Sequence, residues 1–209
     1  MKIQEVLRLS ELEDFYETCF KAFGKDDVRT LGWVNSESQF ARFNAIKSIG
    51  IKSQDHVLDV GCGFGDLYFY LKDSIGDIRY TGIERKKFLA DIARTNLSSE
   101  KNAEIKEHDI IDFDSFDRSF DWVVASGIFP FAYDGFLDEV YGYVKKMFKM
   151  SKSGVSFNLL TSLAPEENKF DHMQYSNPAE IISKFSSIST NFRLLHDYLP
   201  NDMTIHLYK

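Results

Sequence analysis

Apolar and polar positions alternate along this chain in blocks that fit strands and helices in turn. Short runs rich in β-branched and aromatic residues predict strands at 56–60, 77–84, 103–110, 119–129 and 154–160. Apolar residues recur at helical spacing between them, most clearly at 86–97 and 135–151. Strands that alternate with helices of these lengths predict a parallel sheet with helices on both faces.

The C-terminal segment breaks this alternation. A long polar stretch precedes a short helix that we expect to begin near Pro178. Two further strands, 192–199 and 203–209, then follow one another, and a Pro-Asn-Asp turn joins them. The pattern therefore predicts a seven-stranded, mostly parallel sheet that ends in an antiparallel hairpin.

The first fifty residues predict helices that precede this sheet. Ser10 and Glu13 form a capping-box pattern. The apolar residues that follow it at helical spacing are Leu12, Phe15, Tyr16, Cys19, Phe20 and Phe23. A second helix is expected at 36–49, and its apolar side would carry Phe40, Phe43, Ala45 and Ile46. We therefore expect one domain over 1–209, with a helical cover at 1–50 and an α/β core at 55–209.

A glycine-rich segment directly after the first strand predicts a ligand-binding loop. The glycines Gly61, Gly63 and Gly65 follow Asp59 in a G-x-G-x-G pattern, and Asp66 opens the next helix. Glycine lets the backbone turn sharply and approach a ligand, and the helix N-terminus offers unpaired N–H groups. Dinucleotide folds use G-x-G-x-x-G and place a pyrophosphate at that helix end. The different spacing and the acidic Asp66 favour a phosphate-free ligand with adenosine and amino-acid ends, namely S-adenosylmethionine.

The Asp59 motif and the terminal hairpin together resemble the class I (Rossmann-like) S-adenosylmethionine-dependent methyltransferases. The resemblance implies a Rossmann-like fold in which the glycine-loop backbone, Cys62 included, holds the methionine part of the cofactor. It also implies that Asp59 lies beneath the cofactor near its amino group. The alternative is a strand–turn–helix junction whose glycines serve only the turn.

Further cofactor contacts are expected at the ends of the second and third strands, where ligands of open α/β sheets bind. The Glu84 carboxylate can accept hydrogen bonds from both ribose hydroxyls, and it lies at the usual interval after the glycines. The alternative is a solvated acid that Arg85 or Lys86 neutralises. In the family an Asp at the end of the third strand accepts from the adenine amino group, and Asp109 with Ile110 matches that pattern. Asp109 could instead cap a turn or a helix.

The fourth strand ends in Ser126 and Gly127, and the resemblance implies that their backbone lies beneath the methionine chain. Enzymes of the family that methylate base amines usually carry an Asn- or Asp-Pro-Pro-aromatic element here, and this chain does not. Near the N-terminus, the residues Trp33, Ser38-Gln39 and Arg42-Phe43 are similar to a pattern in one bacterial subset of the family, in which the N-terminal helices cover the cofactor. Our hypothesis is that Arg42 pairs with the methionine carboxylate, and the alternative is a surface arginine.

Composition narrows the set of partners. The net charge is −7 and the pI is about 5.3, whereas binding to long nucleic acid normally requires a basic face. Two cysteines argue against a secreted disulfide scaffold. The N-terminus lacks the features of a signal peptide, and no run approaches the ~20 apolar residues that span a bilayer. We expect a cytoplasmic protein with no nucleic-acid or membrane partner and no metal, and the oligomeric state stays open.

The sequence predicts the acceptor less sharply than the cofactor. His172 and Tyr133 lie in loops after the fifth and fourth strands and are the candidate catalytic residues, His172 because histidine titrates near neutral pH. His172 could equally be a loop histidine on the surface. The first hypothesis is methyl transfer to a small molecule at oxygen, for example a sugar or a natural-product precursor. The alternatives are a nicotinamide-dependent oxidoreductase and a non-catalytic module that binds S-adenosylmethionine.

Overall fold

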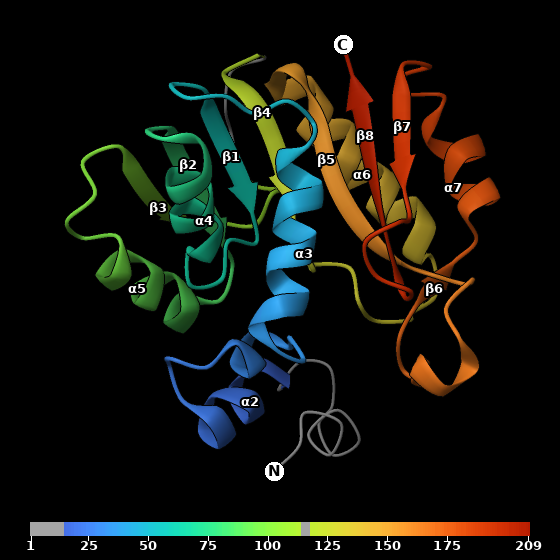
Figure 1. The fold of residues 1–209 in the computed structure, drawn as a ribbon, viewed down its shortest axis with the longest axis horizontal. Helices are drawn as coiled ribbons and strands as arrows, with labels where there is room; N and C mark the ends of the chain where they lie inside the picture. Colours follow the sequence, from blue (N-terminus) through green and yellow to red (C-terminus); the bar gives the residue numbers. More distant parts are fainter. Residues whose placement is uncertain (1–14, 114–117) are drawn as a thin grey trace.

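The computed structural model describes residues 15–113 and 118–209, and one mixed sheet organises them (Figure 1). The strand order is β3-β2-β1-β4-β5-β8-β7, and the short β6 pairs with β5 beside that path. Only β8 runs antiparallel to its neighbours β5 and β7. The strands are β1 (His56–Val60), β2 (Arg79–Glu84), β3 (Ala103–Glu107), β4 (Phe120–Ala125), β5 (Ser151–Thr161), β6 (Tyr175–Ser176), β7 (Phe192–Leu195) and β8 (Asp202–Tyr208).

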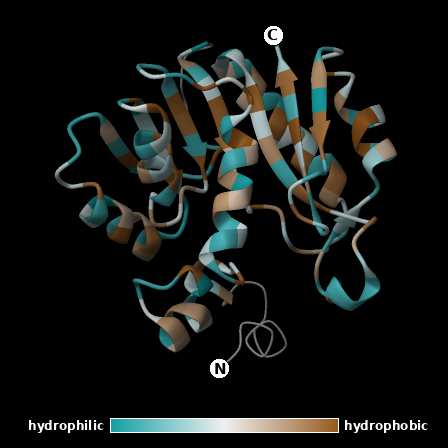
Figure 2. Cartoon of the chain, viewed as in Figure 1, coloured by the Kyte–Doolittle hydropathy of each residue, from teal (hydrophilic) through white to brown (hydrophobic). Residues whose placement is uncertain are grey.

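Helices cover both faces of this sheet. The helical elements are α2 (Phe15–Phe23), η2 (Val28–Leu31), α3 (Ser36–Lys47), α4 (Asp66–Ile75), α5 (Lys87–Asn96), α6 (Phe136–Met150), η3 (Glu166–Asn168) and α7 (Pro178–Phe185). One apolar core lies between the sheet and α6 with α7, and a second lies between the sheet and α3, α4 and α5. Hydrophobic colour accordingly concentrates on the strands and on parts of the helices (Figure 2). The elements α2 and η2 lie beyond the carboxyl ends of β1 and β4 (Figure 1).

The predicted α/β fold with its antiparallel C-terminal strand is confirmed, although the predicted strands 103–110 and 119–129 end earlier, at Glu107 and Ala125, and two further details differ. The polar stretch before Pro178 contributes the two-residue strand β6, so the sheet has eight strands rather than seven. The predicted strand 192–199 ends at Leu195, and a longer connection leads to β8. Its last residues leave the sheet because Tyr198 turns back to bond Asp202 and Thr204. The predicted cap at Ser10 and Glu13, with Leu12, lies outside the described residues.

The helix α3 departs from its expected apolar side. Phe43, Ala45 and Ile46 are buried as predicted, but Phe40 is 48% exposed. Gln39 and Arg42 are buried in its place. These two polar side chains face inward because carboxylates satisfy their donors, the half-buried Asp66 for Gln39 and the buried Asp202 for Arg42.

Within residues 15–113 and 118–209, no helix combines the length and the apolar character needed to cross a bilayer.

A buried histidine makes the stability of this fold depend on pH. His206 on β8 is fully buried, with Nδ1 2.9 Å from Ser156 Oγ and Nε2 3.1 Å from Ser48 Oγ. Burial, with the nearby charge of Arg193, lowers the pKa of His206 to about 4. In the unfolded chain the His206 imidazole has its ordinary pKa of about 6.5, so below that pH the unfolded chain binds a proton that the folded chain does not bind. The contribution of His206 to stability is therefore fully present above pH of about 6.5 and is lost as the pH falls toward 4.

We expect the His206 contribution to the free energy of unfolding to fall by about 2–3 kcal/mol between pH 7.5 and pH 4.5. Urea unfolding of the wild type and of His206→Gln at both pH values measures this. The glutamine cannot titrate, so the wild type should lose more stability on acidification than the variant does. Equal losses in the two proteins would show that His206 does not titrate in this window.

Candidate cofactor and acceptor site

The glycine loop begins where β1 ends and lies against the end of β2. The amides of Gly61 and Cys62 both donate to the carbonyl of Ile83, at 2.8 and 3.1 Å. All three loop glycines have φ between +55° and +82°, a left-handed conformation that favours glycine. The loop therefore turns its backbone toward the carboxyl ends of the strands and delivers Asp66 to the first turn of α4.

Glu84 ends β2 with its carboxylate already held in place. Its Oε2 accepts the Gly63 amide at 3.1 Å, and its Oε1 accepts the Lys86 amide at 2.9 Å. Burial raises the pKa of Glu84, and these two amide hydrogen bonds oppose the rise. Each carboxylate oxygen can accept more than one hydrogen bond, so Glu84 retains capacity for a ligand hydroxyl.

Asp59 on β1 is a second buried carboxyl beneath the loop. The Tyr80 hydroxyl donates to its Oδ2 at 2.6 Å. Burial raises the pKa of Asp59 to about 7, and the charges of Glu84 and Asp66 add to the rise. A cation placed beside Asp59 would stabilise its ionised form.

Asp66 and Gln39 form a third polar group at the same loop, which the sequence analysis did not assign to the site. The Gln39 amide Nε2 donates to Asp66 Oδ2 at 2.9 Å. Burial raises the pKa of Asp66, and the bond from Gln39 opposes the rise. The two residues join α3 to the start of α4 and so fix the helical cover to the glycine loop.

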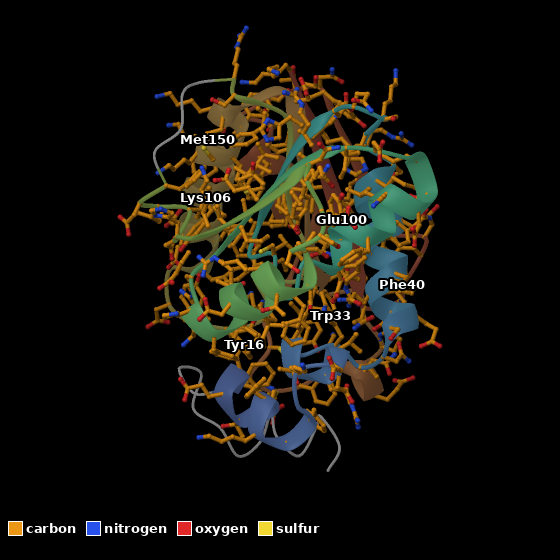
Figure 3. All side chains as sticks on the ribbon, turned by 90° about the vertical axis from the view of Figure 1, so that its left-hand side faces the viewer. Tyr16, Trp33, Phe40, Glu100, Lys106 and Met150 are labelled. Atoms are coloured by element: carbon orange, nitrogen blue, oxygen red, sulfur yellow. The ribbon has the colours of Figure 1, made fainter. Side chains whose placement is uncertain are left out.

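The end of β4 forms a further wall. Gly127 has φ +73°, and its amide donates to Asn158 Oδ1 on β5 at 2.8 Å. The Asn158 amide is also 3.5 Å from Ser126 Oγ. Trp33 packs so closely on the other side of Gly127 that a Cβ built there would lie 2.3 Å from its ring. Figure 3 labels Trp33 and Tyr16 where the N-terminal elements meet the rest of the molecule.

Asp109 follows β3 and is partly exposed. Its Oδ1 accepts the Ile111 amide at 3.0 Å and lies 3.4 Å from the Tyr143 hydroxyl. Arg85 lies 3.9 Å from its other oxygen. The hydrogen bond from the Ile111 amide to Asp109 is typical of a turn, as the alternative interpretation of Asp109 expects. The other carboxylate oxygen of Asp109 faces Arg85.

These groups surround one cavity of about 780 Å³, a size typical of sites for cofactors and small ligands. The predicted site residues that line it are Asp59, Gly61, Cys62, Gly63, Glu84, Asp109, Ile110, Ser126, Gly127 and Tyr133. The cavity also has contributions that the sequence analysis did not assign, and these include Tyr16, Trp33, Gln39, Asp66, Phe129, Phe131, Glu139 and Tyr143. The volume of the cavity, its carboxylates and its glycine backbone fit a nucleoside that carries an amino-acid chain.

Three predicted residues are not among those that line the cavity. Gly65 turns inward, where a Cβ would lie 2.4 Å from Leu97. Arg42 donates from its Nε to Asp202 Oδ2 at 2.7 Å, so its charge is already paired with a carboxylate of the protein. His172 pairs through its carbonyl with the Ala132 amide, and its Nε2 is buried with no hydrogen-bond partner among the described residues.

Tyr133 lies at the edge of the cavity beside Glu139. Partial burial raises the pKa of Tyr133 to about 12, and the charge and hydrogen bond of Glu139 add to the rise. The phenol is therefore protonated at neutral pH. Glu139 lies on α6, in the polar face of a helix whose periodicity gives no sign of its role.

No group of three or more His, Cys, Asp or Glu residues is placed to bind a metal ion in the part of the chain that the structure describes.

Comparisons with known proteins agree on one family. A family model described as a methyltransferase domain matches residues 57–150. Rv1506c of Mycobacterium tuberculosis, which is named a methyltransferase with no stated acceptor, is 31% identical over 156 residues, or 72% of this chain and 91% of the relative.

Solved structures share the fold at low sequence identity. A structure of the Haloferax volcanii Trm112 methyltransferase activator in complex with a methyltransferase aligns with a TM-score of 0.64 at 16% identity, over 90% of this chain and 95% of that one. An S-adenosylmethionine-dependent methyltransferase from Aquifex aeolicus aligns with a TM-score of 0.59 at 13% identity, over 100% and 98% of the two chains.

Proposed function

Because this chain belongs to the class I S-adenosylmethionine-dependent methyltransferases, we propose that it transfers the methyl group of S-adenosylmethionine to an oxygen atom of a small molecule. The observation that carries the proposal is that the cofactor residues and a group of aromatic side chains line one cavity. The aromatic residues of this group are Tyr16, Phe129, Phe131, Tyr133 and Tyr143.

We assign the cofactor to the cavity as follows. Glu84 accepts the ribose hydroxyls, because its buried carboxylate is oriented by two backbone amides and retains acceptor capacity. Asp109 and the Ile110 backbone hold the adenine. The glycine loop holds the methionine part, and Asp59 and Asp66 offer two carboxyls that suit its ammonium group.

The aromatic lining supports a small acceptor with apolar surface. Aromatic and polar side chains that line one cavity suit a small amphipathic molecule better than a nucleic-acid strand, and the net charge of −7 supports the same choice. Both cysteines that could form disulfides, Cys19 and Cys62, are free and buried. Free thiols fit the reducing cytoplasm, where we place the protein.

Bound S-adenosylmethionine supplies an activated methyl group, and its sulfur keeps the electron pair when the carbon–sulfur bond breaks. The protein must orient the acceptor oxygen, exclude water and take up the acceptor proton. Since Tyr133 and Glu139 both line the cavity, and partial burial with the charge of Glu139 raises the pKa of the phenol, we assign the phenol a relay. Its oxygen receives the acceptor proton as its own proton moves to the Glu139 carboxylate, and the acceptor oxygen forms the new bond to carbon.

Isotope transfer tests the proposal. The protein is incubated with S-adenosylmethionine labelled in its methyl group and with separated small-molecule, RNA and protein fractions of a bacterial extract. We expect label in the small-molecule fraction, on a methyl ether that mass spectrometry identifies. Label in RNA or protein alone, or on nitrogen, would contradict the acceptor assignment. Cofactor binding with no transfer to any fraction would favour a non-catalytic module.

With such an acceptor, Tyr133→Phe should lower kcat by about 100-fold, because the relay loses its central hydroxyl. Its affinity for S-adenosylhomocysteine should stay within twofold of the wild type. Tyr141→Phe is the matched control, since that hydroxyl contacts Ser187 and does not line the cavity. Equal rates for Tyr133→Phe and the control would remove Tyr133 from the reaction.

A further inference from the structure

Trp33 is held between a cation and a glycine at the edge of the cavity. The Arg42 guanidinium carbon lies 5.0 Å from the centre of the Trp33 ring. A Cβ built on Gly127 would lie 2.3 Å from Trp33 Cη2 and 2.8 Å from Cζ2, so the ring edge rests directly on the Gly127 backbone. Both Trp33 and Gly127 line the cavity, whereas Arg42 is not among the lining residues. The position of one cavity wall therefore depends on a side chain outside it.

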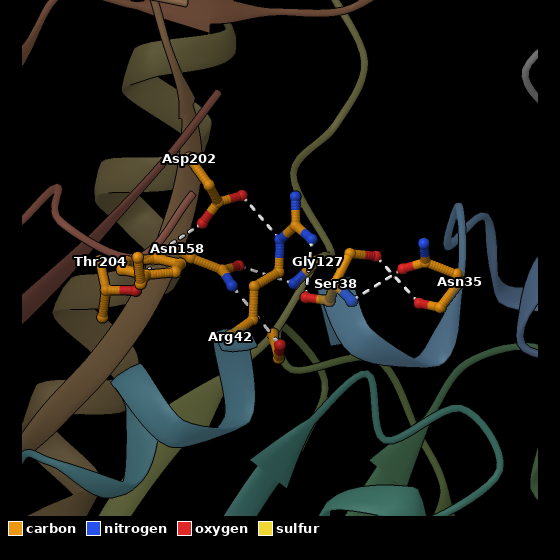
Figure 4. A network of polar contacts seen from close by, with 9 residues as sticks. Asn35, Ser38, Arg42, Gly127, Asn158, Asp202 and Thr204 are labelled. Atoms are coloured by element: carbon orange, nitrogen blue, oxygen red, sulfur yellow. Dashed lines mark hydrogen bonds and ion pairs between the residues drawn. The ribbon is translucent and has the colours of Figure 1, made fainter. Parts of the chain in front are cut away.

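Hydrogen bonds to Asp202 and Ser38 fix the guanidinium of Arg42 (Figure 4). Arg42 is only 7% exposed, its Nε donates to Asp202 Oδ2 at 2.7 Å, and its Nη1 donates to the Ser38 carbonyl at 3.0 Å. Bonds in two directions fix the plane of the guanidinium. Ser38 is on the same helix as Arg42, whereas Asp202 is 160 residues away in the chain.

Asp202 is anchored in turn by the C-terminal strands. It is buried at the first position of β8, and the Tyr198 hydroxyl donates to its other oxygen. The same hydroxyl lies 2.7 Å from Thr204 Oγ1. Thr204 pairs across the sheet with Asn158, whose side chain accepts the Gly127 amide. The C-terminal strands thus hold Gly127 through Asn158 on one side, and through Asp202, Arg42 and Trp33 on the other.

From this chain of contacts we infer that Arg42 is a positioning residue that acts on the cofactor through Trp33. Fixed by Asp202, it holds the Trp33 ring against Gly127, so that the ring closes the cavity beside the end of β4. The inference rests on the proposed cofactor site. It replaces direct contact between Arg42 and the cofactor carboxylate, because the guanidinium is already bonded to Asp202. It also gives the terminal hairpin a role in binding, although that hairpin does not line the cavity.

The test uses the fluorescence of Trp33 itself. Trp122, the other tryptophan in the chain, donates to Asp55 and does not line the cavity, so Trp122→Phe leaves Trp33 as the single reporter. Arg42→Lys keeps a positive charge near Asp202 but loses the planar guanidinium that stacks on the ring. The matched control is Lys47→Met. Lys47 is on the same helix as Arg42, and the substitution removes a cation that lies 5.4 Å from the centre of the Tyr70 ring on α4. Circular dichroism and thermal unfolding serve to check that each variant is folded.

In the ligand-free protein we expect Arg42→Lys to shift the Trp33 emission to longer wavelength and Lys47→Met to leave it unchanged. With S-adenosylhomocysteine, Arg42→Lys should raise Kd by about 3- to 30-fold, the range of a cation–π contact. In a Trp33→Leu background, where binding is followed by calorimetry, Arg42→Lys should have no further effect on Kd.

Two results would overturn the inference. Equal effects of Arg42→Lys with Trp33 present and in the Trp33→Leu background would mean that Arg42 acts on the cofactor independently of Trp33. An unchanged Trp33 emission would mean that Arg42 does not position the ring. If the wild type bound no S-adenosylhomocysteine, the proposed function would fail, and the emission of the ligand-free variants would still decide whether Arg42 positions Trp33.

Discussion

Replacement of Glu84 by alanine is expected to lower the affinity for S-adenosylmethionine by at least about 100-fold. Two ribose hydroxyls each donate to a buried carboxylate in our assignment, and such charge-assisted bonds contribute about 1.5–3 kcal/mol each. The variant would also leave the Gly63 amide, 3.1 Å from the lost oxygen, without its acceptor at the turn of the loop. Both losses act at the same place in the cavity.

Calorimetric titration with S-adenosylhomocysteine measures this effect. Glu84→Gln should give an intermediate affinity, because its amide oxygen still accepts while its NH₂ group opposes one of the backbone amides. Glu104→Ala is the control, since that carboxylate lies exposed on β3 and pairs with Lys106 at 3.3 Å. An affinity of Glu84→Ala within twofold of the control would refute the ribose assignment.

The second large effect is expected from Gly127→Ala. A left-handed conformation costs an L-residue roughly 1–2 kcal/mol, and Gly127 has φ +73°. The new methyl group would also lie 2.3 Å from Trp33, which Arg42 prevents from moving away. The chain must therefore displace either the Trp33 ring or the β4 loop, and both line the cavity.

We expect Gly127→Ala to lower the affinity for S-adenosylhomocysteine by at least about 10-fold and the melting temperature by roughly 4–10 °C, for a cost of about 2–3 kcal/mol. Gly135→Ala separates the two causes, because Gly135 has φ +82° but nothing within 4 Å of its built Cβ. That control carries the backbone strain without the clash. If both variants bound the ligand equally well, the contact with Trp33 would have no part in binding.

The sequence predicted those parts of the site that local rules determine. The glycine spacing after Asp59 and the interval to Glu84 belong to one strand–loop–helix–strand unit, in which neighbours in sequence are neighbours in space. Chain-local patterns of this kind also located the helices and strands of the core. The antiparallel C-terminal strand was predictable because two successive strands with a short connection can pair only in an antiparallel hairpin, whereas a parallel pair requires a long crossover.

The helical cover could not be predicted in the same way. Hydrophobic periodicity placed Phe40 on the inner side of α3, whereas Gln39 and Arg42 are buried there with partners on α4 and β8. Asp202 was expected in a turn, but it forms a buried ion pair with a residue 160 positions away. A pattern within one segment contains no information about such distant partners, so the paired charge of Arg42 and the inward side of Trp33 required the structure.

The acceptor side of the cavity could not be predicted from the sequence either, because loops whose partners are distant in the chain form it. Tyr133 and His172 belong to connections of similar polarity, yet only Tyr133 lines the cavity. The backbone of residues 130–132 pairs with that of residues 172–174, and this pairing has no signature in either loop. Glu139, the neighbour of Tyr133, lies on the polar side of a regular helix.

The position of the ribose tests the account most directly. A crystal structure of the protein with S-adenosylhomocysteine should place both ribose hydroxyls within about 3 Å of the Glu84 carboxylate, with the amino-acid chain along the glycine loop. A nucleoside bound elsewhere, or one whose ribose points away from Glu84, would contradict it.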